Sequence, residues 1–303
     1  MENNNIIKKI LELKENRKAV ILAHNYQIGE VQDIADYVGD SLGLSQAAGK
    51  TEAEVIVFCG VHFMAETAAI LCPNKTVLMP DINAGCAMAN MITLRQLKEM
   101  KSKYPGAVVV CYVNSTAEIK AESDYCCTSS NSVKIVEHIP KDKQVLFIPD
   151  KYLGSYVSSQ LKRDLILWEG YCPTHRRILA EDILKNKNLH PKAEVLVHPE
   201  CTPDVIAMAD KVFSTSGMVK YVSQSASDEF IIGTEIGILH TLKKKEPDKK
   251  FYPATLLADC ENMKLINLEK ILWSLEDMVY PVKVPEDIAK KAKKSIDRML
   301  ELG

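Results

Sequence analysis

The chain has 303 residues, 47% of them hydrophobic, so it can bury a large core and divide into two or three domains. Its formal charge is −2, with basic residues spread among acidic ones, so nucleic acid is not an expected partner. No apolar run approaches the roughly 20 residues that cross a bilayer, and the first residues carry no signal-peptide pattern. We therefore expect a cytoplasmic protein that has no membrane segment.

The predicted elements alternate between short β-branched runs and longer helical patterns. A first helix is expected where Ile6, Ile10 and Leu13 form one apolar stripe. The segments that follow are strand 19–24, helix 30–50, strand 54–60, helix 61–72 and strand 76–81. The strands are apolar without in-and-out alternation, which is typical of parallel sheets covered by helices. The predicted fold class is therefore α/β.

The same order of elements recurs along the chain. Three strands end in a polar triplet, and the triplets begin 88 and 86 residues apart. They are HNY from His24, YVN from Tyr112 and HPE from His198. The recurrence predicts three similar three-layer α/β/α modules with parallel sheets around a pseudo-threefold axis, and an active site at their shared centre.

The predicted modules cover residues 1–104, 105–190 and 191–303. The third is expected to carry a C-terminal helix, because apolar residues at its end form one stripe. The members of this stripe are Ile288, Ala292, Ile296 and Met299.

One cysteine occupies an equivalent place in each predicted module. Cys86, Cys172 and Cys260 are 86 and 88 residues apart, and each follows the start of its triplet by 60 to 62 residues. If the strand carboxyl ends face inward, the three thiols converge. Three thiolates suit a [4Fe-4S] cluster with one iron that lacks a protein ligand and acts as a Lewis acid.

Spacing alone leaves a second metal site open. His175 follows Cys172 by three residues, so a closed Cys3His zinc site is the alternative. His175 has two further interpretations, as a hydrogen-bond partner of substrate or ligand and as a residue that starts a helix. The other cysteines have no counterparts in the repeat, and we interpret them as small buried hydrophobes. They are Cys59, Cys72, Cys111, Cys126, Cys127 and Cys201.

The triplets point two side chains each toward one face, because side chains alternate along a strand. The six groups are His24 and Tyr26, Tyr112 and Asn114, and His198 and Glu200. Together they can bind anionic oxygens and move protons, although each alone also suits a core or strand-end role.

Three small hydroxyl residues, Ser41, Ser129 and Thr215, follow at the same spacings where helices are expected to begin. They suit either a phosphate or carboxylate site or plain helix caps. The segment 233–237, GTEIG, is predicted to be a tight strand-to-helix turn beside the same pocket.

Nine motifs together resemble the quinolinate synthase family over nearly the whole chain. They are AHNYQ, GDS, CAMAN, YVNST, CTSSN, CPTH, VHPEC, STSGM and GTEIG. The resemblance implies three similar domains and a [4Fe-4S] cluster. It also implies that the chain condenses iminoaspartate (iminosuccinate) with dihydroxyacetone phosphate to quinolinate, phosphate and water in de novo NAD biosynthesis.

The resemblance also implies roles for individual residues. The implied cluster ligands are Cys86, Cys172 and Cys260. The implied substrate-binding residues are His24, Ser41, Tyr112, Asn114, Ser129, His198, Glu200 and Thr215. The implied catalytic residues are Tyr26, Glu200 and His198, with Tyr26 and Glu200 as the acid/base pair and Glu200 as the proton shuttle. The open iron is expected to take the leaving hydroxyl.

One departure from some family members concerns the third ligand. Those members carry a CxxC redox pair there, whereas Cys260 is followed by Glu261, Asn262 and Met263, so no such switch is expected. Functional coupling is expected to the enzyme that supplies iminoaspartate, either an aspartate oxidase or an aspartate dehydrogenase. The alternatives to a quinolinate synthase are an iron–sulfur carrier or sensor and an unrelated cluster dehydratase.

Overall fold

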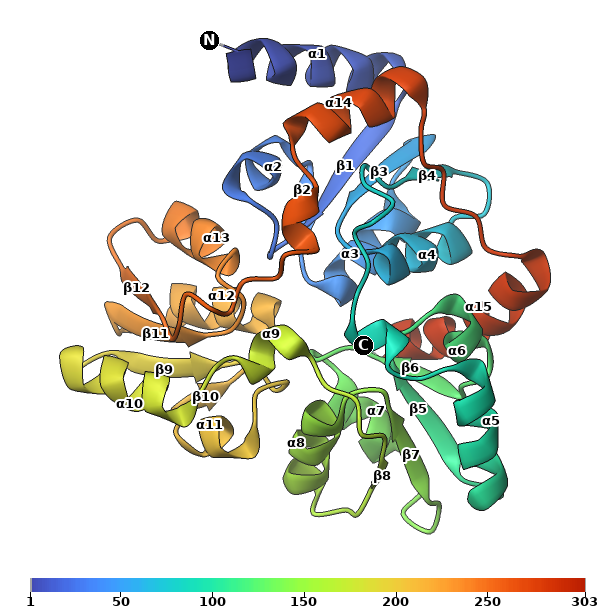
Figure 1. Ribbon diagram of the computed structural model, residues 1–303, viewed down its shortest axis with the longest axis vertical. Helices are drawn as coiled ribbons and strands as arrows, with labels where there is room; N and C mark the ends of the chain where they lie inside the picture. Colours follow the sequence, from blue (N-terminus) through green and yellow to red (C-terminus); the bar gives the residue numbers. More distant parts are fainter. Residues whose placement is uncertain (1, 303) are drawn as a thin grey trace.

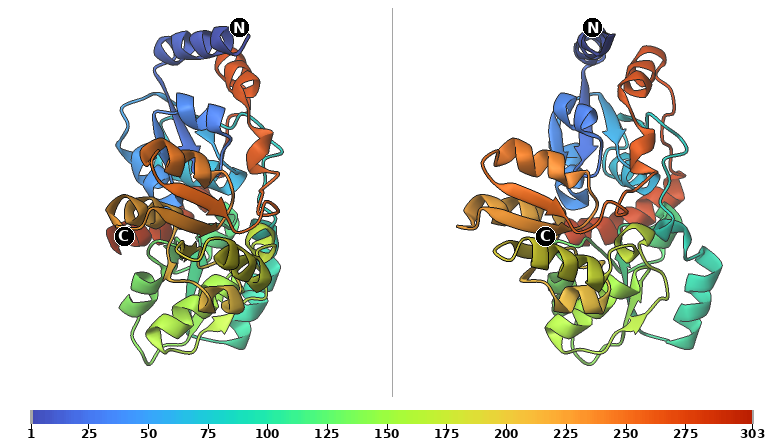
Figure 2. Two further views of the ribbon diagram at one scale, coloured as in Figure 1. Left: turned by 90° about the vertical axis from the view of Figure 1, so that its left-hand side faces the viewer. Right: turned by 60° about the vertical axis from the view of Figure 1, so that its left-hand side comes forward.

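The computed structural model describes residues 2–302 and contains three four-stranded sheets (Figures 1 and 2). The first sheet comprises β1 Ala19–His24, β2 Tyr37–Gly39, β3 Val55–Cys59 and β4 Thr76–Leu78. The second comprises β5 Val108–Tyr112, β6 Tyr125–Cys127, β7 Val145–Ile148 and β8 Ile166–Leu167. The third comprises β9 Glu194–Val197, β10 Lys211–Val212, β11 Glu229–Gly233 and β12 Lys250–Pro253.

The three sheets share one topology. Their strand orders are β2-β1-β3-β4, β6-β5-β7-β8 and β10-β9-β11-β12, and all pairings are parallel. The central strands are apolar on both faces, and every residue of β3 and β7 is buried. Parallel strands buried on both faces need helices on either side, which these sheets have. The predicted α/β class and its threefold repetition are confirmed.

The helices between strands follow the repeat. In and after the first sheet lie α1 Glu2–Asn16, α2 Gly29–Ile34, α3 Ser41–Lys50, α4 His62–Leu71, the 3₁₀ helix η1 Met88–Asn90 and α5 Leu94–Lys103. With the second lie α6 Ala117–Ala121, α7 Ser132–His138, α8 Lys151–Leu161, α9 Pro173–Arg176 and α10 Ala180–Leu189. With the third lie α11 Pro203–Ala207, α12 Thr215–Gln224, α13 Ile238–Lys245, the 3₁₀ helix η2 Met263–Leu265, α14 Leu268–Asp277 and α15 Glu286–Leu302.

Each sheet also repeats one polar contact. An aspartate just before the short second strand accepts a hydrogen bond from a backbone N–H early in the first strand. The contacts are Ile21 to Asp36, Val109 to Asp124 and Val195 to Asp210, each 2.8 Å long. The aspartate therefore fixes where the second strand pairs with the first.

The prediction of one helix over 30–50 is wrong. The segment divides into α2, β2 and α3, and β2 pairs with β1 from Tyr37 to Gly39. A three-residue strand is too short to show a period in sequence, and the tertiary contact of Asp36 with β1 decides its place.

The two ends of the chain cover the first two sheets. α1 lies beside α14, and α15 packs against α4, α6 and β6 (Figure 1). The predicted stripe on α15 is buried at Ala292, Ile296 and Met299, and Ile10 of α1 is buried too. The C-terminal helices thus pack on the first two sheets. The boundaries at residues 104 and 190 stay predictions. No helix in residues 2–302 is long and apolar enough to cross a bilayer.

Candidate active site

A cavity of about 240 Å³ lies where the carboxyl ends of the three sheets meet. All of the candidate site residues line it. They are His24, Tyr26, Ser41, Cys86, Tyr112, Asn114, Ser129, Cys172, His198, Glu200, Thr215 and Cys260. The convergence expected from the repeat is therefore present, and the role of each residue stays a prediction.

The first strand of each sheet delivers its polar triplet to the cavity. β1 ends at His24, β5 ends at Tyr112, and β9 ends one residue before His198. Two triplets share a local turn, in which the ring Nδ1 accepts from the backbone N–H two residues later. Tyr26 N lies 3.2 Å from His24 Nδ1, and Glu200 N lies 3.3 Å from His198 Nδ1. The turn fixes both imidazoles.

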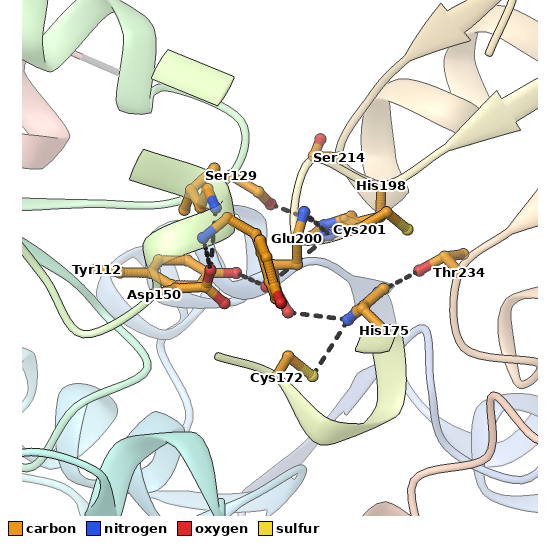
Figure 3. Close-up of polar contacts among 12 residues, drawn as sticks. Tyr112, Ser129, Asp150, Cys172, His175, His198, Glu200, Cys201, Ser214 and Thr234 are labelled. Carbon is orange, nitrogen blue, oxygen red and sulfur yellow. Dashed lines mark hydrogen bonds and ion pairs between the residues drawn. The ribbon is translucent and has the colours of Figure 1, made fainter. Parts of the chain in front are cut away.

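Glu200 lies at the centre of this polar group (Figure 3). Its Oε1 accepts a hydrogen bond from the Tyr112 hydroxyl, and its Oε2 lies 2.9 Å from His175 Nδ1. His198 Nδ1 lies 3.8 Å from Oε1. Burial opposes ionisation of this carboxyl, but the imidazoles of His175 and His198 and the hydrogen bonds from His175 and Tyr112 lower its pKa overall. Glu200 is therefore a carboxylate at neutral pH.

The other triplet groups are neutral. Burial lowers the pKa of His24 to about 4 and that of His198 to about 3. Burial, with the nearby charge of Glu200, raises the pKa of Tyr26 and of Tyr112 well above the ordinary value. Among the triplet groups at the cavity, Glu200 is thus ionised, the imidazoles of His24 and His198 are neutral, and the phenols of Tyr26 and Tyr112 keep their protons.

His175 connects this group to one of the cysteines. Its Nδ1 lies 3.2 Å from Cys172 Sγ as well as close to Glu200, and its Nε2 lies 2.8 Å from Thr234 Oγ1. Its ring stacks on that of His198, with centroids 4.6 Å apart. The interpretation of His175 as a hydrogen-bond partner is the one that the structure supports; α9 also begins two residues before it.

Two of the three hydroxyl residues at the cavity lie at helix starts, whereas Ser129 lies three residues before α7. Ser41 and Thr215 begin α3 and α12, and Ser129 lies 3.2 Å from His198 Nε2. The caps are their neighbours, because Asp40 and Ser214 accept from the first turns of α3 and α12. The interpretation of Ser41 and Thr215 as plain caps is therefore wrong. Their hydroxyls are free of that capping role beside two helix N-termini, where anions bind.

Side chains next to these hydroxyls hold the three sheets together. Ser130 Oγ donates to Asp40 Oδ2 at 2.6 Å and lies 2.9 Å from Ser214 Oγ. Asn25 donates to Thr215 Oγ1 at 2.9 Å. Because these contacts join elements of different sheets, the anion-binding side of the cavity forms only in the assembled fold.

The three cysteines are held by the same backbone contact in each sheet. A residue at or just before the start of the helix after the third strand donates its N–H to the carbonyl two residues before the cysteine. The contacts are His62 to Ala84, Lys151 to Gly170 and Ile236 to Ala258, at 2.8 to 3.0 Å. Each cysteine loop is thus fixed against its own sheet.

The environment of the three thiols differs from that of the other cysteines. Cys86, Cys172 and Cys260 are half-buried at the cavity, whereas the other six are buried. Each precedes a short helical turn: η1, α9 or η2. Burial raises the three thiol pKa values, that of Cys86 to about 12, and backbone N–H groups of the turn lower them in part. N–H groups aimed at sulfur suit thiolates that bind metal.

The Cys3His zinc set does not form in residues 2–302. His175 gathers with Cys172 and Glu200, the three ligand atoms lying within 4.8 Å of one another, and not with Cys86 and Cys260. Three thiols from three sheets around one cavity instead fit a cluster that leaves one iron without a protein ligand.

Comparison with known proteins agrees with this geometry. Residues 8–301 match the family model described as quinolinate synthetase A protein. The chain belongs to the quinolinate synthetase A family. A relative in Dehalococcoides mccartyi, named quinolinate synthase, is 58% identical over 97% of both chains. Relatives of the same name in Methanosarcina barkeri and Thermodesulfovibrio yellowstonii are 55% and 54% identical, over 99% of this chain and 98% and 99% of their own.

Quinolinate synthases of this family carry a [4Fe-4S] cluster. The donor set around the cavity fits this group, because three thiols converge and no fourth cysteine lines the cavity in the described residues.

Sequence reasoning missed several residues of the site. Thr234, whose Oγ1 lies 2.6 Å from the Tyr26 hydroxyl, was noticed only as part of a turn. Glu235 lines the cavity, which confirms the prediction that the turn 233–237 lies beside the pocket, and Arg177 after α9 lines it too. Their positions after a strand and after CPTH were the available signals, but their partners lie far away in sequence.

Proposed function

We propose that the chain condenses iminoaspartate with dihydroxyacetone phosphate to give quinolinate, phosphate and water in NAD biosynthesis. The observation that supports this proposal most directly is that the cavity lined by the three cysteines is also lined by a carboxylate, imidazoles, phenols, an amide and hydroxyls. A carrier or sensor of iron and sulfur needs no such ring. Membership in the quinolinate synthetase A family supports the specific substrates.

In this proposal the helix starts bind the anionic groups of the substrates. Ser41 and Thr215, with the N-termini of α3 and α12, hold a phosphate or carboxylate, and Ser129 completes the set. Asn114 contributes an amide whose buried Oδ1 has no hydrogen-bond partner among the described residues. An unpaired buried amide oxygen is expected to accept from a ligand donor, such as the nitrogen of iminoaspartate.

Proton transfer is assigned to Glu200 and Tyr26. Glu200 is ionised and can accept a proton at Oε1 or Oε2, which Tyr112 and His175 hold in place. Tyr26 retains its proton at neutral pH and can donate it from the hydroxyl, which Thr234 orients. Conversion of the triose from ketone to aldehyde needs a base at carbon and an acid at oxygen, and this pair provides both.

Cys86, Cys172 and Cys260 would hold the cluster. When bound, it supplies an iron that acts as a Lewis acid toward an oxygen of the substrate. The imidazoles of His24 and His198 are neutral, so they can stabilise substrate oxygens by hydrogen bonding without placing fixed positive charge in the cavity.

The test is quinolinate formation by anaerobically purified, iron- and sulfide-reconstituted protein supplied with both substrates. Single alanine variants of the three cysteines are expected to lose both iron and turnover, whereas Cys59→Ala keeps them, because Cys59 is buried in β3 away from the cavity. A wild-type protein that holds about four irons and makes no quinolinate would contradict the substrate assignment. Turnover of a hydroxy acid but not of the triose phosphate would favour the dehydratase alternative.

The same proposal includes functional coupling of this chain to the enzyme that supplies iminoaspartate, either an aspartate oxidase or an aspartate dehydrogenase. It also places the chain in the cytoplasm. Imines hydrolyse in water, so a supplying enzyme must work close in time to this one. Coupled assays with either enzyme, compared with chemically generated iminoaspartate, test which source supports turnover.

A further inference from the structure

Glu235 is a buried carboxylate that contacts the loop of the third cysteine. It follows β11 and has no exposed surface. Its Oε1 accepts a hydrogen bond from Cys260 N at 3.0 Å, and its Oε2 accepts one from Gly237 N at 2.7 Å. One side chain thus ties the backbone of Cys260 to the turn between β11 and α13.

Lys264 links the same carboxylate to the first module. Its Nζ lies 2.8 Å from Glu235 Oε1 and also donates to the backbone carbonyl of Tyr26. Gly237 allows this close approach, because a Cβ there would lie 2.7 Å from the Tyr26 carbonyl carbon and oxygen. The ion pair therefore lies between the backbone of a proposed cluster ligand and that of the proposed acid.

The repeat places a carboxyl group at the equivalent position of the second module. Alignment of β11 with β7 pairs Glu235 with Asp150, which is also fully buried. Burial raises the pKa of Asp150, and the backbone N–H of Cys172 opposes this rise in part, but Asp150 Oδ2 has no hydrogen-bond partner among the described residues. The carboxyl group recurs beside the second cysteine loop, whereas the hydrogen bond from the cysteine N–H is formed by Cys260. The first module has Val61 at this position, so the recurrent feature is confined to two of the three cysteine loops.

We propose that Glu235 and Lys264 are positioning residues: their ion pair, fully buried at Glu235 and half-buried at Lys264, holds the Cys260 loop and the Tyr26 backbone in one fixed arrangement and balances the charge beside the cluster. The inference rests on the proposed assignment of Cys260 as a ligand. Neither residue is part of the set assigned to substrate or proton transfer. Each of the two side chains carries a charge and also contacts the backbone. Substitution of Glu235 is therefore expected to have two separable effects, one on the cysteine loop and one on the charge beside the cluster.

The first effect concerns the loop. Cys260 N and Gly237 N donate to different oxygens of Glu235, so a glutamine at 235 places an NH2 donor against one of these N–H groups and loses that hydrogen bond. In the iron-free full chain, Glu235→Gln is expected to increase the alkylation rate of Cys260 by roughly tenfold, as expected when a charge-assisted hydrogen bond that closes the loop is lost. Mass spectrometry of the same sample also measures the alkylation rate of Cys86, which serves as an internal reference. This readout requires no turnover, so it stays informative if the substrate proposal fails.

The second effect concerns charge. Glu235→Gln removes the carboxylate nearest Lys264 and leaves Asp259 Oδ1, at 3.7 Å, as its carboxylate partner. The net charge beside the cluster becomes more positive, and positive charge near an iron–sulfur cluster raises its reduction potential. Removing both charges in Glu235→Gln with Lys264→Met is expected to return the potential toward the wild-type value. A role in folding alone would not produce this reversal.

The matched control is Glu229→Gln, on the strand β11 that precedes Glu235, which removes a glutamate from the exposed ion pair with Lys250. It is expected to change neither readout. The inference is overturned if Cys260 in Glu235→Gln reacts no faster than in the control. It is equally overturned if the double variant keeps the full shift in potential.

Discussion

The Nδ1 atom of His175 lies 2.9 Å from Oε2 of Glu200 in the buried centre of the molecule. The two residues come from different predicted modules, and each is almost fully buried. The imidazole lowers the pKa of the carboxyl, so it keeps the proposed base ionised in a site where burial alone would protonate it.

His175→Asn is therefore expected to raise the pKa of Glu200. Activity that needs the carboxylate should then be lost at a higher pH as the solution is acidified, and kcat/KM should fall about a hundredfold at neutral pH. The pH dependence of kcat/KM measures both effects. His190→Asn is the matched control, since His190 stacks on Tyr252 outside the cavity. An unchanged acid limb in His175→Asn would contradict the assignment.

Stability is expected to decrease as pH falls, because burial lowers the folded-state pKa of His24 to about 4 from 6.5. Between these values the unfolded chain binds more protons than the folded one, so acid favours unfolding. His24 should account for roughly 2 kcal/mol of the stability lost between about pH 7 and pH 5. Denaturant titrations of wild type and His24→Gln at both pH values measure it. Parallel losses in the two proteins would show that His24 is not responsible.

The repeated aspartates should matter for folding and not for metal binding. Asp124→Ala leaves the buried N–H of Val109 without its acceptor, which should decrease the free energy of unfolding by about 1–2 kcal/mol. Asp142→Ala, in an exposed loop, is the control and should have little effect. Denaturant midpoints measure the difference, and iron content should match wild type in both variants. Equal midpoints would contradict a stabilising role for the contact.

Cys201 tests whether closeness to Glu200 in sequence implies a metal-binding role. Its side chain is buried away from the cavity, and its Sγ lies 3.4 Å from the Gly233 carbonyl. Cys201→Ala should therefore keep its iron and its cluster absorption spectrum, whereas Cys172→Ala should lose both. Loss of iron from Cys201→Ala, in a variant that remains folded by circular dichroism, would assign Cys201 to the metal site.

Most of the site residues could be predicted from the threefold repeat in the sequence. Periodic spacing of His24, Tyr112 and His198 placed three strand ends at one centre, and all of the candidate residues derived from it line the cavity. The short strand β2 was missed because three residues carry no measurable period. The role of His175 stayed open, since its partners Thr234 and Glu200 come from the third sheet and its loops.

The amino-acid order is enough to predict the α/β class, the threefold repetition and the three equivalent cysteines, because parallel strands and the loops after them leave apolar runs and polar residues at regular spacing. The pairs that set the chemistry, His175 with Glu200 and Glu235 with Lys264, arise from the three-dimensional fold. These interactions depend on how side chains from separate sheets face one another across a buried space. Burial and these partners then shift the pKa values of Glu200 and Glu235, which no local pattern encodes.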